Sequence, residues 1–205
     1  MSIDRAGLPF ILAALAPGAV LVLVGRPLWG APLLLLAAFF AFFFRDPQRR
    51  TPQGRALVIA PADGRVMAAG PATSAPTPGQ WLQVTIFLSP MDVHINRVPA
   101  RGRVTRVEYH PGAFLPAYKP ESSENERTEI WVDHDGQPVV FRQVVGLLAR
   151  RVVCRLEPGQ QVEAGQRFGL MKFGSRMDVF LPGHARLRVR AGERVRGGET
   201  VIAEL

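Results

Sequence analysis

The sequence has only one cysteine, Cys154, among its 205 residues. A single thiol excludes an internal disulfide framework and a cysteine-rich zinc site. We interpret Cys154, which follows Val152 and Val153, as a buried thiol. The four histidines also lack the helical or hairpin spacing of metal ligands, so no metal site is predicted.

Lysine is nearly as scarce as cysteine. Lys119 and Lys172 are the only lysines among 25 basic residues, so the formal charge of +8 comes almost wholly from arginine. Arginine's planar guanidinium suits phosphate and carboxylate groups. No stacked aromatic platform or recognition-helix pattern accompanies the charge, so we expect no nucleic-acid partner. An anionic membrane surface or a phospholipid head group fits better, although arginines spread over a solvated surface remain an alternative.

Helical patterns are confined to the N-terminal region, residues 1–45, which we predict to be a membrane-associated helical hairpin. Two apolar runs, Leu8–Val24 and Leu28–Phe44, are each about 17 residues long, just enough to cross a thin hydrocarbon core. The arginines that flank the hairpin predict a cell-membrane location with both ends in the cytoplasm. The domain that follows would then lie on the cytoplasmic side. A re-entrant hairpin embedded from one side is the alternative.

Residues 46–205 have the sequence pattern of an all-β domain. Leu82, Val84, Ile86 and Leu88 alternate with Gln83, Thr85 and Phe87, and glycine-bearing turns recur along the chain. A second alternating run covers residues 185–190. These patterns predict a compact β-sandwich or barrel.

A weak internal repeat runs through the C-terminal part. Residues 159–168 and 192–201 share a Gly-x-x-Val-x-x-Gly spacing, which predicts two similar tight-turned hairpins. Such units resemble the biotinyl and lipoyl carrier domains, so the fold is predicted as a duplicated biotinyl/lipoyl-like hybrid. Met171-Lys172 resembles the modified lysine of a carrier, and a membrane-tethered carrier or scaffold module is the alternative function.

Three polar residues form a candidate acid, base and nucleophile set. Asp63 lies in an Asp-Gly turn, His94 follows the best strand of the sequence, and Ser175 follows Gly174 inside an apolar run. Catalytic triads are recognised by roles and not by order, so an ordinary serine hydrolase also stays open. The sequence around Ser175 lacks the Gly-x-Ser-x-Gly elbow, which counts against a hydrolase.

Several short motifs occur in order along the chain: Phe43-Phe44-Arg45-Asp46-Pro47, Pro61-Ala62-Asp63-Gly64, Ser89-Pro90-Met91-Asp92-Val93-His94, Asn125-Glu126-Arg127, Gln143-Val144-Val145-Gly146 and Phe173-Gly174-Ser175. Together they resemble the short form of phosphatidylserine decarboxylase proenzyme, a pyruvoyl-dependent family. The resemblance covers essentially the whole chain, including its hydrophobic N-terminus.

The resemblance implies self-maturation. The Ser175 hydroxyl would attack the Gly174 carbonyl, with His94 as general base and Asp63 orienting it. Glycine suits this position because it has no side chain to block the attack. Cleavage between residues 174 and 175 would leave a β chain and a short α chain that begins with a pyruvoyl group made from Ser175.

The resemblance further implies decarboxylation of phosphatidylserine to phosphatidylethanolamine. The pyruvoyl group would form a Schiff base with the lipid amine and act as the electron sink, so neither pyridoxal phosphate nor a metal is expected. Arg127 and Lys119 are candidate ligands of the phosphate, and surface charge is the alternative for both. The resemblance also makes a homodimer plausible.

One position departs from the family pattern. Longer members carry two histidines in the segment that matches residues 92–99, whereas here His94 is the only one and Arg97 stands at the second place. We therefore expect His94 to serve both maturation and decarboxylation.

Overall fold

The chain forms two compact units, Met1–Gln48 and Arg49–Leu205, in a computed structural model that describes residues 2–115, 124–146, 152–172 and 175–205. The sequence predicts a boundary after residue 45. The short strand β2 (Arg45–Asp46) pairs with β1 (Ser2–Ile3), and this pairing belongs to the first unit.

The first unit is a hairpin of two apolar helices, α1 (Leu8–Leu23) and α2 (Pro27–Phe43), preceded by a short 3-10 turn, Arg5–Gly7. The helices approach closely at two glycines, since a Cβ on Gly30 would lie 2.6 Å from the Gly18 carbonyl oxygen. The segment Arg5–Leu23, 19 residues with a mean hydropathy of 2.2, is long and apolar enough to cross a membrane, and α2 is shorter.

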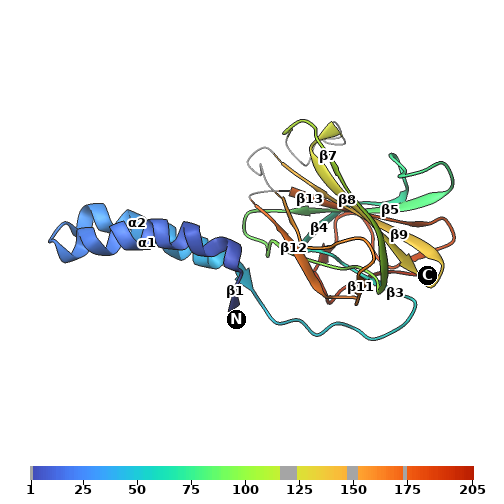
Figure 1. Ribbon diagram of the computed structural model, residues 1–205, viewed down its shortest axis with the longest axis horizontal. Coiled ribbons are helices and arrows are strands. Elements are labelled where there is room, and N and C mark those ends of the chain that lie inside the picture. Colours follow the sequence, from blue (N-terminus) through green and yellow to red (C-terminus); the bar gives the residue numbers. More distant parts are fainter. Residues whose placement is uncertain (1, 116–123, 147–151, 173–174) are drawn as a thin grey trace. The chain divides into compact units, whose positions relative to one another are not determined.

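The second unit consists of antiparallel strands (Figure 1). Its described strands are β3 (Leu57–Ile59), β4 (Gly64–Pro71), β5 (Trp81–Leu88), β6 (Ile95–Arg97), β7 (Gly102–His110), β8 (Arg127–His134), β9 (Gln137–Val144), β10 (Val152–Cys154), β11 (Gln161–Val162), β12 (Arg167–Met171), β13 (Ser175–Pro182), β14 (Arg186–Leu187), β15 (Arg194–Val195) and β16 (Val201–Glu204). The all-β prediction is confirmed. Over residues 185–190 the strand is shorter than the alternation predicted.

The core lies on one face of an eight-stranded sheet with the order β11-β7-β8-β9-β13-β5-β4-β15. The predicted alternation of β5 is confirmed, because Val84, Ile86 and Leu88 are all fully buried in the core. Met177 and Val179 of the neighbouring β13 also contribute to it. Full burial of such a side chain stabilises the fold by about 1.5–3 kcal/mol.

The order of the strands is symmetric about the β9–β13 pair. Two three-stranded sheets, β10-β12-β6 and β14-β16-β3, repeat the symmetry. The glycine repeat also matches, since φ is 92° at Gly159 and 93° at Gly192. The predicted hairpins are wrong, because β11 and β15 join the eight-stranded sheet whereas β12 and β16 belong to the three-stranded sheets. The unit therefore consists of two halves with the same arrangement of strands.

The two halves differ at one turn, and the difference defines the site. In one half β8 runs directly into β9, with His134 opposite Gln137 and the turn Asp135-Gly136 between them. In the other half the matching strands are β5 and β13, with Leu88 opposite Ser175. Residues 89–174 are inserted where that turn would be. They contain β6 to β12, the strands of the half that includes β8 and β9.

Candidate active site

Ser175 is the first residue of β13 and lies at the end of the inserted segment. Side chains alternate along a strand, so Ser175 faces the core side of the sheet, as does Met177. The side chain is fully buried, and Oγ has no hydrogen-bond partner in the described part of the chain. Gly174 lies outside the described residues.

His94 immediately precedes β6 and is fully buried. Its Nδ1 lies 2.9 Å from the Asp92 carbonyl oxygen. A carbonyl can only accept, so we assign the proton to Nδ1, which leaves Nε2 as the ring's proton acceptor. The ring is thereby oriented for a general base.

Both ends of the short segment between β12 and β13 are held by hydrogen bonds. The Met171 amide donates to the His94 carbonyl at 3.2 Å, and Ser175 pairs with Leu88 of β5. The structure therefore brings the backbone of His94 to one end of the segment that includes Gly174, with Ser175 at the other end.

Asp63 lies in the turn before β4, at the same end of the sheet as Ser175. Arg65 pairs with Phe87, and Phe87 pairs in turn with Arg176, the residue that follows Ser175. Among the described residues Asp63 makes no hydrogen bond with His94. The chain bends at residues 61–63 and Gly64 already belongs to β4, where a Cβ would lie 2.2 Å from the Phe87 carbonyl oxygen and so only glycine fits.

The Asp63 carboxylate is held by two donors. Its Oδ2 accepts from Nη2 of Arg49 at 2.7 Å, and its Oδ1 accepts from the Gly197 amide at 2.8 Å. Burial raises the pKa of Asp63, the Arg49 charge and both hydrogen bonds oppose this rise, and the charge of Asp92 adds to it. The sequence analysis predicted no site role for Arg49. It grouped this residue with the arginines that flank the helices.

Asp92 shapes the loop that carries His94. Its Oδ2 accepts from the Ser89 amide at 2.9 Å and from the Ser89 hydroxyl at 2.8 Å. This closed turn fixes the carbonyl of Asp92 that accepts from the His94 ring. The polar motif Ser-Pro-Met-Asp was a sequence signal for such a turn.

Arg127 begins β8 and faces away from the core, on the side of the sheet opposite to the Ser175 side chain. Arg127 is opposite Val144 of β9, and Val144 is opposite Arg176 of β13, so the three residues lie in one row across the sheet. Burial lowers the pKa of Arg127, and the neighbouring charge of Arg142 lowers it further. Lys119, the other candidate phosphate ligand, lies outside the described residues.

Arg97, which stands at the place of the second family histidine, has a structural contact. Its Nη1 donates to the Gly165 carbonyl at 3.0 Å, and the side chain is buried. The arginine thus ties β6 to the turn before β12.

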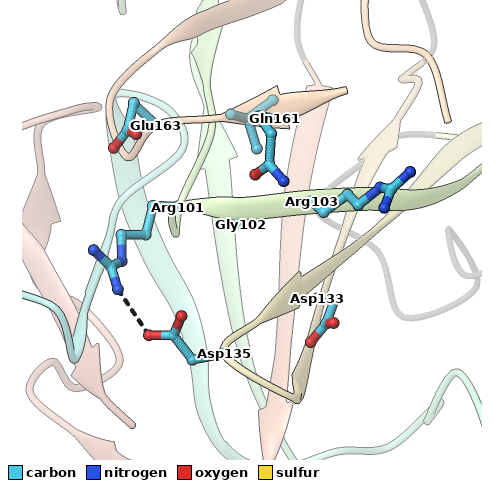
Figure 2. A pocket seen from close by; sticks show the side chains of 8 residues that line it. Arg101, Gly102, Arg103, Asp133, Asp135, Gln161 and Glu163 are labelled. Atoms are coloured by element: carbon cyan, nitrogen blue, oxygen red, sulfur yellow. Dashed lines mark hydrogen bonds and ion pairs between the residues drawn. The ribbon is translucent and has the colours of Figure 1, made fainter. Parts of the chain in front are cut away.

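A hollow of about 380 Å³ lies in the other half of the unit, where Arg101 takes the place that Asp63 has (Figure 2). Arg101 forms an ion pair with Asp135 at 2.8 Å. The residues that line this hollow include no serine, cysteine or histidine. The repeated half therefore does not repeat the chemistry of the candidate site.

One cluster has the composition of a metal site. Glu108, His110 and Glu129 place ligand atoms within 4.8 Å of one another. Both carboxylate oxygens of Glu129 already accept hydrogen bonds, from Trp131 and from Arg142. The absence of a metal stays a prediction.

Comparison with known proteins identifies the family. A family model for phosphatidylserine decarboxylase matches residues 36–203. The chain belongs to the phosphatidylserine decarboxylase family. A phosphatidylserine decarboxylase proenzyme from Prosthecochloris aestuarii is 48% identical over 174 residues, which cover 84% of this chain and 80% of the relative.

Two further relatives with the same name cover more of the chain. The protein from Nitrosomonas europaea is 42% identical over 204 residues, 98% of this chain and 94% of its own. The protein from Chlorobium phaeovibrioides is 45% identical over 201 residues, 95% of this chain and 91% of its own. The resemblance inferred from the motifs is confirmed, and the family consists of carboxy-lyases made as proenzymes.

Proposed function

We propose that this chain is a proenzyme that cuts itself before Ser175 and then decarboxylates phosphatidylserine to phosphatidylethanolamine. The observation that carries the proposal is the position of Ser175. It is a fully buried hydroxyl at the end of an inserted segment, and that segment is bonded through Met171 to the backbone of His94. Family membership supplies the substrate and the reaction class.

Maturation begins when Ser175 Oγ attacks the carbonyl carbon of Gly174 and His94 Nε2 takes the hydroxyl proton. The peptide C–N bond breaks, an ester replaces it, and the proton moves to the freed amine of residue 175. Loss of the Cα proton and of the Gly174 carboxylate then gives dehydroalanine. Water converts this group to a pyruvoyl group and releases ammonia.

The chain's own residues account for the polar chemistry of maturation. The Asp92 carbonyl holds the His94 ring with Nε2 unprotonated, and the negative charge of Asp63 stabilises the histidine cation once it forms. Arg49 and the Gly197 amide favour the charged form of Asp63 against the cost of its burial. Asp63 thus acts through its charge and not through a direct bond to the ring.

The pyruvoyl group supplies an electron sink for the carbanion that remains when carbon dioxide leaves, without pyridoxal phosphate or a metal. His94 holds the proton that this carbon receives. Arg127, which begins β8 at the end of the sheet, and Lys119, which lies outside the described residues, remain the proposed ligands of the lipid phosphate.

The helical hairpin anchors the enzyme at the cell membrane. Apolar side chains are exposed along it, among them Leu12, Leu23, Leu28, Trp29 and Leu35, and such surfaces mark contact with lipid. Arginines at both ends favour the cytoplasmic side for the second unit, and a homodimer is part of the proposal. The proposed kinship of the two halves with biotinyl and lipoyl domains rests on their tight glycine turns.

A carrier module with a modified Lys172 is the weaker alternative, because it explains neither His94 nor Asp63. The two functions are separated by measuring carbon dioxide from phosphatidylserine labelled in the serine carboxyl group, with purified protein in detergent. The decarboxylase releases labelled gas at a rate proportional to the amount of cut protein. A fully cut preparation that releases none would contradict the proposal.

A further inference from the structure

Asn96 and Gln143 are two fully buried amides that each carry a polar atom without a partner among the described residues. Both side chains are 0% exposed, and the atoms are Asn96 Nδ2 and Gln143 Oε1. An unpaired buried donor or acceptor costs about 1–3 kcal/mol. Native proteins leave few such atoms, and each calls for an explanation.

The orientation of both amides follows from a backbone contact. Gln143 Nε2 donates to Asn96 Oδ1 at 2.8 Å and to the Val153 carbonyl at 3.2 Å. A carbonyl only accepts, so the nitrogen of Gln143 must face it, and both of its hydrogens are used. The pair consequently offers one free donor, on Asn96, and one free acceptor, on Gln143.

The pair lies beside the candidate catalytic residues. Gln143 is opposite Met177 in β13, and Ser175 is two residues before Met177 on the same face. Diagonal neighbours of this kind are about 7–8 Å apart. Asn96 follows His94 by two residues, so both side chains point to the same side of their extended segment. Gln143 therefore links the three side chains that carry unpartnered atoms, since it bonds with Asn96 and is the diagonal neighbour of Ser175.

We propose that Asn96 and Gln143 recognise the reacting end of the serine head group. Asn96 Nδ2 donates to the carboxylate of the lipid, and Gln143 Oε1 accepts from its amine. The inference rests on the proposed function, since it assumes that the lipid amine reacts at residue 175. It adds Asn96 as the residue that distinguishes a serine head group from an ethanolamine one, and Gln143 as a ligand of the amine that both head groups carry.

Neutral amides suit a carboxylate that must leave. A guanidinium would form strong charge-assisted hydrogen bonds with the carboxylate and stabilise the bound substrate more than the transition state, in which that charge disperses. One amide donor orients the carboxylate at a lower cost to the reaction. Arg127 lies on the other face of the sheet, away from the Ser175 side chain, and Arg176 on that face is ion-paired with Asp178 at 3.0 Å, so neither is placed to hold the carboxylate.

The decisive variant is Asn96→Asp, which keeps the oxygen that accepts from Gln143 and replaces only the unpartnered nitrogen. Purified enzyme is incubated with cyanoborohydride and either phosphatidylserine or phosphatidylethanolamine, and the lipid attached to the α chain is measured by denaturing mass spectrometry. We expect normal self-cleavage and at least about a tenfold loss of the phosphatidylserine adduct, which corresponds to about 1.4 kcal/mol. The phosphatidylethanolamine adduct, which has no carboxylate, should be unchanged.

Gln83→Glu is the matched control. Gln83 is also a buried amide, but its Nε2 donates to Thr85 at 2.9 Å and its Oε1 accepts from the Thr73 amide at 3.3 Å. This variant should form both adducts as the parent does. Asn96→Ser, which removes the nitrogen without adding charge, gives the same comparison if Asn96→Asp fails to fold or to cut itself.

The proposal is overturned if the two adducts of the Asn96 variants fall equally, or if neither falls. Failure of the proposed function gives a different result. In that case the parent protein itself remains uncut or forms no adduct with either lipid.

Discussion

Leu88 and Ser175 face each other across β5 and β13, so the strand before residues 89–174 and the strand after them are direct neighbours. In the other half the matching pair, His134 and Gln137, is closed by a two-residue turn. The chain thus enters and leaves its inserted segment at one point of the sheet. A cut at that point frees a chain end without removing a strand.

The α and β chains should therefore stay together after self-cleavage. β13 belongs to the α chain and forms hydrogen-bonded pairs with β5 and β9, both in the β chain. Native mass spectrometry should give one complex with the summed mass of the two chains, and denaturing conditions should separate them. Fragments that separate in native buffer would show that the sheet does not hold the α chain.

Arg49→Gln should slow maturation and change its dependence on pH. Burial raises the pKa of Asp63 and the Arg49 charge opposes this, so removal of Arg49 raises that pKa further. Less carboxylate is then present at a given acidic pH, and the acid limb of the rate profile moves to higher pH. Self-cleavage can be followed by gel electrophoresis across the pH range.

Glu199→Gln serves as the control for that variant. Glu199 accepts from Arg49 at 3.2 Å but does not contact Asp63 among the described residues. Loss of the Glu199 charge should leave the acid limb of the self-cleavage rate profile at nearly the same pH as in the parent. If Arg49→Gln and the parent have the same profile, Arg49 does not act through Asp63.

Glu129→Gln should strongly destabilise the second unit. Glu129 and Arg142 form a buried ion pair, with side chains 7% and 9% exposed, and loss of one partner leaves the other charge buried. Breaking such a pair costs about 3–5 kcal/mol, which chemical denaturation measures as a lower free energy of unfolding. Glu204→Gln, which breaks the exposed pair with Arg188, should have little effect. Equal effects of the two changes would contradict this account.

Cys154 should react slowly with alkylating reagents. The thiol was expected to be buried, but the structure shows it half-buried, and burial raises its pKa above the usual range. Because an acid with a raised pKa ionises only at higher pH, the thiolate fraction at pH 8 is below that of a free cysteine. Iodoacetamide labelling should accelerate after unfolding in urea. A native rate equal to that of a free thiol would refute the prediction.

Local patterns predicted the strands better than they predicted polar contacts. Alternation was enough for β5, because one side of that strand faces the core. It gave no warning that Thr85, on the other face, is also buried and donates to Asp178 at 2.9 Å. Strand patterns describe the inner face, whereas contacts on the outer face depend on which strands become neighbours.

The candidate site shows the same limit. Ser175, His94 and Asp63 were selected from their residue types and local sequence, and the family resemblance then gave each of them a role. Arg49 was missed because its contact with Asp63 depends on the path of residues 50–62, which local sequence patterns do not predict. Asn96 and Gln143 were also missed, since their pairing joins strands that lie far apart in the sequence.

The central claim is that Ser175 becomes the blocked end of a new chain, and denaturing mass spectrometry of the purified protein tests it most directly. The account predicts two chains, residues 1–174 and a smaller one that starts at position 175 with a pyruvoyl group. Ser175→Ala should give one uncut chain. A single intact parent chain with an ordinary serine at position 175 would contradict the account.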